Sequence, residues 1–271
     1  MYPELLKLGP ITVYTYGVLL AAAYLLGLKL AMTRAKSRGL DPNRALDLGI
    51  AIIVAALVGA KLLLILVDFD KFRQNPAEIF SVVRAGGVFY GGLIAAVAVA
   101  FWYMWRHRMP LWTTCDVFAP GIALGHAVGR LGCLMAGCCY GRETHVPWAI
   151  TFTNPEAAAN VGTPLGVPLH PTQLYESAAE ALILVLLLWT EKKGRPFEGR
   201  TFWSYLVLYG ISRFVIEFFR GDERGVVFGT ISTSQFISLI IVPVAIGMLL
   251  YLSRQTSSSP VPASARVRRA S

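Results

Sequence analysis

The chain has 271 residues, of which 55% are hydrophobic and 15% are charged. Soluble domains carry about 25% charged residues, so this composition excludes an ordinary soluble enzyme and a disordered chain. The formal net charge is +9, but most basic residues flank apolar stretches. This placement favours a role in membrane orientation over nucleic-acid binding, and no nucleic-acid partner is expected. Four cysteines do not make the disulfide framework of a small secreted domain.

Seven apolar stretches follow one another along the chain. They cover residues 12–32, 46–67, 87–105, 113–132, 172–190, 201–218 and 234–252. Each has about the length that an α-helix needs to cross a hydrocarbon core. The stretches are continuous rather than alternating, which favours helices over barrel strands. We therefore expect an all-α, polytopic membrane protein with about seven transmembrane helices.

The basic residues of the connections predict the orientation. The connections after the first, third, fifth and seventh stretches hold about twice as many Lys and Arg as the opposite set. By the positive-inside rule the amino terminus lies outside and the carboxyl terminus inside. No cleavable signal peptide is predicted. The longest outer connection, residues 133–171, is expected to form a small extracytoplasmic head.

The domain organisation predicted from these patterns is simple. Residues 1–252 form a single transmembrane domain. Residues 253–271 are rich in Ser, Pro and Arg. Such a composition has little to bury, and it predicts a disordered basic tail.

The first group of polar residues at membrane depth lies at the end of the fourth stretch. A charge at the bilayer centre costs at least about 2.5–3.5 kcal/mol, so such residues are candidates for function. His126 and Arg130 are four residues apart and share a helical face, and Arg142 follows in the same glycine-rich segment. The alternative is a glycine-rich packing seam from which Arg130 reaches outward.

The second group is His170-Pro171-Thr172-Gln173-Leu174-Tyr175-Glu176, continuing to Glu180. A helix is expected to begin at Pro171 or Thr172. Gln173, Glu176 and Glu180 then form one polar stripe, since they recur at spacings of three and four. The alternative is that they satisfy neighbouring polar atoms, and this interpretation is favoured for Glu180.

The third group lies near the end of the sixth stretch. Tyr209, Arg213 and Glu217 share a face at successive steps of four, and Arg220 follows one turn later. Arg213 and Glu217 are expected to pair, which reduces the burial penalty for both. The alternative is a purely structural ion pair.

Four arginines of these groups are predicted to lie near the outer leaflet. Their planar guanidinium groups suit phosphate and carboxylate, and an anion is needed where several gather in an apolar setting. We predict an anionic phospholipid headgroup as that anion. The four are Arg130, Arg142, Arg213 and Arg220.

Several ordered motifs at compatible spacing carry a resemblance to a known family. They are Tyr16-Gly17, Gly86-Gly87-Val88-Phe89-Tyr90-Gly91-Gly92-Leu93, Asp116 to Pro120, Gly129-Arg130-Leu131-Gly132 to Gly141-Arg142, His170 to Glu176, Tyr209 to Arg220, and Ser234-Gln235-Phe236-Ile237-Ser238. The chain resembles the phosphatidylglycerol–prolipoprotein diacylglyceryl transferases. That family has seven transmembrane helices with the amino terminus outside.

The resemblance implies an activity, a location and a set of site residues. The thiol of a lipobox cysteine in a preprolipoprotein attacks the diacylglyceryl carbon of phosphatidylglycerol, and glycerol 1-phosphate leaves. The protein is then a multi-pass protein of the bacterial inner membrane whose partners are phosphatidylglycerol, the lipobox peptide and membrane lipids. No metal or organic cofactor is implied. The implied catalytic residues are Arg130, Arg213, Tyr90, Tyr16 and Glu217, and the implied substrate-binding residues are Arg130, Arg142, His170, Gln173, Glu176, Tyr209 and Arg220.

The chain departs from the family pattern at a few positions. A histidine usually stands where Tyr90 lies, and tyrosine is a poor base at neutral pH. His126 and His170 are candidate substitutes. Asparagine, asparagine and glutamate usually stand where the chain has Cys133, Ala136 and Cys138. These changes motivate an alternative, a membrane protein that binds or translocates lipid without transferase activity; a transporter of a small anion is a further alternative.

The cysteines give one more expectation. Cys133, Cys138 and Cys139 are predicted to lie at an oxidising outer surface, where Cys133 and Cys138 can form a disulfide. A disulfide or a packing role is favoured over a metal site with His126 or His145, because the spacing is unusual for metal ligands.

Overall fold

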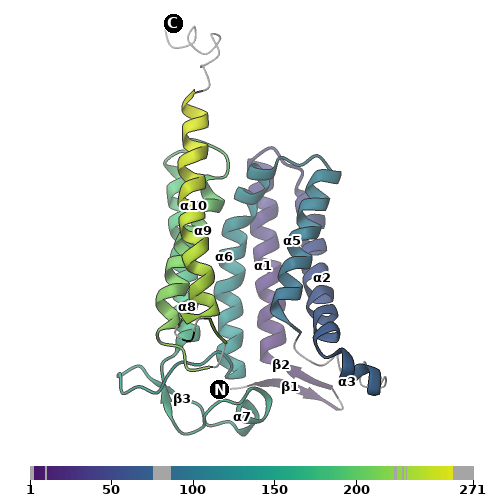
Figure 1. The fold of residues 1–271 in the computed structure, drawn as a ribbon, viewed down its shortest axis with the longest axis vertical. Coiled ribbons are helices and arrows are strands. Elements are labelled where there is room, and N and C mark those ends of the chain that lie inside the picture. Colours follow the sequence, from purple (N-terminus) through teal and green to yellow (C-terminus); the bar gives the residue numbers. More distant parts are fainter. Residues whose placement is uncertain are drawn as a thin grey trace, which may run out of the picture. The chain divides into compact units, whose positions relative to one another are not determined.

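The computed structural model describes residues 3–9, 11–75, 87–222, 225–227, 229 and 231–258. The chain divides into two compact units, one formed by Met1–Leu30 with Cys115–Ser271 and the other by Ala31–Thr114. Long helices dominate both units (Figure 1). The helices are α1 (Thr15–Ser37), α2 (Pro42–Val67), α3 (Phe69–Gln74), α5 (Phe89–Arg106), α6 (Leu111–Ala136), α7 (Pro155–Val161), α8 (Thr172–Lys192), α9 (Arg200–Glu217) and α10 (Thr233–Ser258).

Three short antiparallel strand pairs accompany the helices. They are β1 (Glu4–Leu8) with β2 (Ile11–Tyr14), β3 (Ile150–Thr151) with β4 (Pro168–Leu169), and β5 (Val226–Val227) with β6 (Ile231–Ser232). The hydropathy pattern did not predict them, since strands of two to five residues produce no apolar stretch of the length sought.

The expected all-α, multi-pass architecture is confirmed, with a long helix at each predicted stretch. Six of these helices, in the described part of the chain, are long and apolar enough to cross a membrane by length and composition. Helix α9 is not among them, because Arg200, Arg213 and Glu217 interrupt its apolar surface.

Two predicted boundaries differ from the structure. Helix α6 continues to Ala136, so the connection expected from residue 133 begins at Gly137. Helix α10 continues to Ser258, so the start of the predicted tail is helical; residues 259–271 of that tail lie outside the described residues.

The second unit is built on close packing of α2 against α5. A Cβ atom added at Gly59 would lie 2.5 Å from the carbonyl oxygen of Gly91, and one added at Gly92 would lie 2.8 Å from that of Ala56. Small residues thus let the two backbones touch, as is common between membrane helices. Gly87 has a φ of +65° and leads the chain into α5. Gly86 of the same motif lies outside the described residues.

The first unit holds α6, α8, α9 and α10. Ala119 and Ala123 of α6, Ile183 and Leu187 of α8, and Tyr205 of α9 form one buried apolar cluster. Helix α9 runs beside both α8 and α10 (Figure 1). The apolar cluster thus brings together α6, α8 and α9, which carry the polar groups identified from the sequence.

Asp116 fixes the start of α9. Gly199 precedes this helix in a left-handed conformation and offers no side-chain cap. Instead, the buried Asp116 carboxylate accepts hydrogen bonds of 2.8 Å from the backbone N–H groups of Gly199 and Phe202. A carboxylate at a helix amino terminus satisfies open donors and matches the helix dipole. Asp116 therefore orients the helix that carries Arg213.

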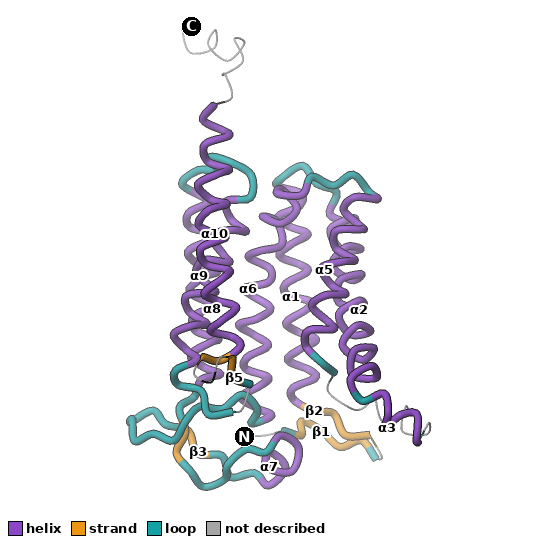
Figure 2. The backbone as a smooth tube through the Cα atoms, in the orientation of Figure 1, coloured by secondary structure: helices purple, strands orange, loops and turns teal. Residues whose placement is uncertain are grey.

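The segment between α6 and α8 is largely loop, with β3 and α7 as short elements (Figure 2). Asn154 caps α7 by accepting from the Glu156 N–H, and Pro155 begins the helix. Phe152 and Leu169 pack on Leu134 at the end of α6. The segment therefore has a small core that is continuous with α6.

Candidate functional site

The carboxylate of Glu176, in the first turns of α8, is the centre of a buried ionic cluster. Glu176 is 3% exposed. Its Oε1 lies 2.8 Å from Nη1 of Arg213 and 2.8 Å from Nη1 of Arg220. Its Oε2 lies 2.5 Å from Nε of Arg130. One side chain of α8 thus gathers arginines from α6, from α9 and from the segment after α9.

Arg213 and Arg220 have further protein partners. Nη2 of Arg213 lies 2.6 Å from Glu217, which confirms the predicted pairing, and it also donates to the hydroxyl of Ser234 at 2.9 Å. Arg220 donates to both oxygens of Asp222 through Nε and Nη2. Burial lowers the pKa of Arg220, but the hydrogen bond to Asp222 and the negative charge of Glu176 raise it more, to above its ordinary value. Both guanidinium groups are thus held by several protein partners.

Arg130 is engaged differently. Its Nε contacts Glu176 and also donates to Nε2 of His126 at 3.1 Å. Among the described residues both contacts are made by Nε, and neither Nη group of Arg130 makes a hydrogen bond. The other ring nitrogen of His126 lies 2.7 Å from Oε1 of Glu180. His126 is therefore occupied on both sides, with its Nε2 lone pair directed at Arg130.

The sequence predicted arginines in need of an external anion, and the structure modifies that interpretation. Glu176, Glu217 and Asp222 supply carboxylates to Arg130, Arg213 and Arg220. The sequence did not show that Glu176 is the shared partner of these arginines, because the spacing of residues within α8 does not reveal contacts with other helices. Its nearest partner in the sequence, Arg213, is 37 residues away.

An apolar hollow of about 640 Å³ lies between α8 and α9 next to this cluster. His170 lines it, and Nδ1 of His170 lies 3.1 Å from the hydroxyl of Tyr175. The same hydroxyl accepts a 2.7 Å hydrogen bond from the indole N–H of Trp148. The remaining lining residues are Val146, Ala179, Ser212, Val215, Ile216 and Phe219.

Two other predicted site residues lie close to the cluster. Gln173 is fully buried one turn before Glu176, and its Nε2 donates to the carbonyl of Cys138 at 2.8 Å. The ring of Tyr209 lies 5.6 Å from that of His126. The polar stripe predicted for α8 is confirmed, because Gln173, Glu176 and Glu180 are all buried, and α8 begins at Thr172 as expected.

Three predicted residues are not brought to Glu176 among the described contacts. Nε of Arg142 donates to the backbone carbonyl of Arg220 at 3.1 Å, so Arg142 supports the chain behind the cluster. Tyr16, at the start of α1, packs against α6 near Gly132 and is 39% exposed. Tyr90 is 42% exposed and belongs to the other unit.

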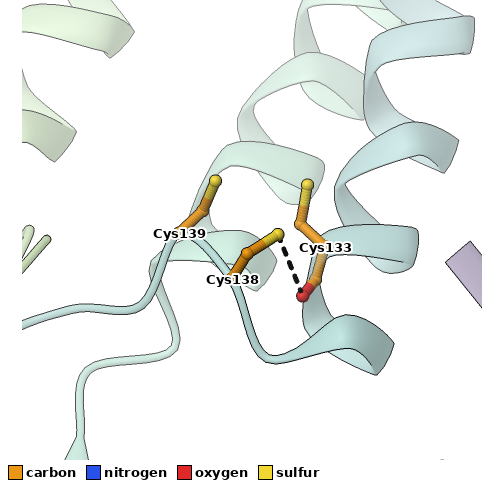
Figure 3. A group of neighbouring side chains, drawn as sticks. All are labelled: Cys133, Cys138 and Cys139. Carbon is orange, nitrogen blue, oxygen red and sulfur yellow. Dashed lines mark hydrogen bonds between the residues drawn. The ribbon is translucent and has the colours of Figure 1, made fainter. Parts of the chain in front are cut away.

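No disulfide joins the cysteines. The sulfur atoms of Cys133, Cys138 and Cys139 lie within 4.8 Å of one another (Figure 3). The Sγ of Cys138 also points at the carbonyl oxygen of Cys133, 3.8 Å away. Neither His126 nor His145 joins this group in the described part of the chain, contrary to the metal arrangement considered from the sequence.

Comparison of the chain with known proteins identifies its family. The family model described as prolipoprotein diacylglyceryl transferase matches residues 3–251. The chain belongs to the prolipoprotein diacylglyceryl transferase family. It is 37% identical over 246 residues to a phosphatidylglycerol–prolipoprotein diacylglyceryl transferase of Clostridium tetani, covering 91% of this chain and 96% of the relative.

Other members of the family show similar coverage. A second enzyme of that name from Clostridium perfringens is 35% identical, covering 88% of this chain and 90% of the relative. The one from Corynebacterium diphtheriae is 30% identical, with 93% and 92% covered. These full-length matches do not favour the alternatives of a lipid-binding protein without transferase activity or an anion transporter.

Proposed function

We propose that this member of the prolipoprotein diacylglyceryl transferase family transfers the diacylglyceryl group of phosphatidylglycerol to the lipobox cysteine of preprolipoproteins. It acts at the outer leaflet of the bacterial inner membrane, with its amino terminus outside. The observation that carries the proposal is the convergence of Arg130 and Arg213, from two different helices, on the two oxygens of one carboxylate. A lipid phosphate presents oxygens of similar charge and spacing.

Arg130 is the residue that we assign to the departing phosphate. Its two Nη groups, which make no hydrogen bond among the described residues, form a planar fork that suits a phosphate. Arg213 acts with it by exchanging part of its contact with Glu176 for the phosphate, while Glu217 and Ser234 keep it in place. Positive charge fixed where negative charge develops is the largest contribution that such a site makes to catalysis.

The reaction has one covalent step. The acceptor sulfur attacks the glyceryl carbon, a carbon–sulfur bond forms, and the carbon–oxygen bond to phosphate breaks. The oxygen keeps the electron pair and leaves as glycerol 1-phosphate.

The thiol proton must go to a base. His126 is a poor candidate because Arg130 and Glu180 occupy both its nitrogens. His170 is better suited, since Nε2 makes no hydrogen bond among the described residues and the ring lines the hollow. Tyr16, which packs against α6 near Gly132, is proposed to line the reacting end.

The apolar hollow between α8 and α9 is proposed to hold an acyl chain. Its lining is almost entirely hydrocarbon, and Glu176 and Arg213 immediately follow Tyr175 and Ser212 of its wall in the sequence. A lipid with its chain in this hollow would have its headgroup beside the arginines.

The test is an assay of the purified protein with phosphatidylglycerol and a lipobox peptide, read by mass spectrometry of the thioether adduct. Arg130→Ala and Arg213→Ala should abolish the adduct while helical content is retained. Arg195→Ala is the matched control, because Arg195 lies after α8, pairs with Glu191 and is outside the cluster. Normal adduct formation by both cluster variants would refute the assignment. Absence of adduct from the wild-type protein in a lipid-competent preparation would refute the function.

A further inference from the structure

Three thiols converge at the end of α6. Cys133 belongs to the helix, whereas Cys138 and Cys139 belong to the loop that follows it, and their three sulfur atoms face the same small space (Figure 3). All three sulfur atoms lie within 4.8 Å of one another. A disulfide joins two thiols and leaves the third over, whereas a metal ion engages all of them.

The loop that carries these thiols is held in shape from α8. Nε2 of Gln173 donates to the carbonyl of Cys138 at 2.8 Å, and the hydroxyl of Thr172 donates to the carbonyl of Cys139 at 2.7 Å. Cys139 itself has a φ of +63°, a conformation that a residue other than glycine adopts only when its surroundings enforce it. The backbone is therefore constrained in a way that keeps the sulfur atoms together.

An unused acceptor adjoins the thiols. Gln173 is fully buried, and its Oε1 has no hydrogen-bond partner among the described residues, although Nε2 is engaged. A buried amide oxygen without a donor is costly unless a ligand or an ordered water supplies one. A water bound beside Cys138 would supply that donor.

The thiols are adjacent to the ionic cluster along two helices. Cys133 follows Arg130 by three residues on α6, and Glu176 follows Gln173 by three residues on α8, so each pair shares a helical face. Arg130 and Arg220 both contact Glu176, so two positive charges lie near the thiols. These positive charges offset the negative charge that a set of thiolate ligands brings into an apolar region.

We propose that Cys133, Cys138 and Cys139 bind one Zn²⁺ ion and leave its fourth coordination position open to a thiol. Three protein ligands with an open position are typical of zinc sites that take part in catalysis, and thiolates favour soft cations. Sulfur ligands on a tetrahedral ion, at about 2.3 Å from it, lie about 3.8 Å apart. The present separations of up to 4.8 Å therefore require a shift of at most about 1 Å.

The identity of the fourth ligand rests on the proposed function. The acceptor cysteine of the peptide would give its proton to the base, displace a water and bind the ion as a thiolate. Its sulfur would then lie beside Cys133, which is about one helical turn from Arg130. The carbon–sulfur bond forms and the carbon–oxygen bond breaks as described above, and the metal is unchanged at the end.

The first test measures metal binding to the full-length protein, purified in detergent, reduced and stripped of metal. One equivalent of Zn²⁺ should bind, and Co²⁺ should give the sulfur-to-metal absorption and intense visible bands of a tetrahedral thiolate site. Cys133→Ser, Cys138→Ser and Cys139→Ser should each weaken binding at least tenfold. Cys115→Ser should leave it unchanged, because Cys115 lies about 27 Å away along α6. Substoichiometric binding, or binding of Cu⁺ without Zn²⁺ or Co²⁺, would overturn the proposal.

The second test addresses the open position. A lipobox peptide added to the Co²⁺ protein should strengthen the sulfur-to-metal absorption, and the same peptide with serine in place of cysteine should not. Arg195→Ala, outside the ionic cluster and away from the thiols, should keep the metal and the spectral response. If adduct forms without any bound metal, the metal inference fails and the proposed function stands. If metal binds and the peptide alters the spectrum but no adduct forms, the proposed function fails instead.

Discussion

Glu176→Gln is the substitution that tests the ionic cluster most directly. The amide has nearly the same shape as the carboxylate, but it removes the negative charge that faces Arg130, Arg213 and Arg220. Breaking a buried ion pair by removing one partner costs about 3–5 kcal/mol, because the remaining charge is left uncompensated. Arg213 and Arg220 keep Glu217 and Asp222, which places the expected loss near the lower end of this range.

The measurement is thermal unfolding of the detergent-solubilised protein. A loss of 3–5 kcal/mol corresponds to a decrease in Tm of about 6–20 °C for a chain of this size class. Glu180→Gln is the matched control, one turn further along the same buried face of α8. Glu180 contacts His126 rather than an arginine, so a smaller decrease is expected.

Added lipid distinguishes a binding site from a structural cluster. Because Glu176→Gln leaves the arginines in excess, phosphatidylglycerol should raise the Tm of the variant by more than that of the wild type. A lipid with a neutral headgroup should change the Tm of the variant and of the wild type by the same amount. A ligand that binds only the folded state stabilises it by about 2.7 kcal/mol at a concentration of 100 Kd. An unchanged Tm in Glu176→Gln, or equal stabilisation of both proteins by the two lipids, would contradict the reasoning.

Five further substitutions test other parts of the argument. Arg130→Lys keeps the charge but loses the planar fork, and should lower the rate of adduct formation about 10²–10³-fold with normal Tm. Asp116→Ala leaves the N–H groups of Gly199 and Phe202 without their acceptor and should destabilise the protein by about 3 kcal/mol in denaturant unfolding. Gly141→Ala places a Cβ 2.7 Å from the carbonyl oxygen of Phe219 and against His170, so Tm should fall, whereas Gly162→Asn in its exposed left-handed position should be tolerated. Ala179→Trp fills the apolar hollow and should raise the KM for long-chain phosphatidylglycerol more than that for a short-chain analogue, and equal KM changes would argue against an acyl site.

Much of the helical framework could be predicted from the sequence because apolar length and spacing are local properties. The predicted stretch 172–190 became α8 with its start at Thr172, and the pairing of Arg213 with Glu217 followed from a step of four within α9. The contact of His126 with Arg130 also lies within one helical turn. Short elements such as β3 and α7 were missed, since they contain too few residues for periodicity to identify.

The contacts that assemble the candidate site could not be predicted in the same way. Glu176 was placed in a polar stripe, but its role as the shared partner of Arg130 and Arg220 depends on how α6 and α8 pack. Arg142 looked equivalent to Arg220 in the sequence, yet its Nε donates to the backbone of Arg220. The thiols were considered as a disulfide or with histidine, while the loop geometry brings three sulfur atoms together.

The sequence by itself determined where the long helices run, which face of each is polar and which family the motifs resemble, because these depend on residues close together in the chain. Only the tertiary structure decided which polar faces meet. Asp116 caps a helix 83 residues further along the chain, and Glu176 binds an arginine 44 residues away. Such pairings follow from the packing of helices against one another, which no local spacing specifies.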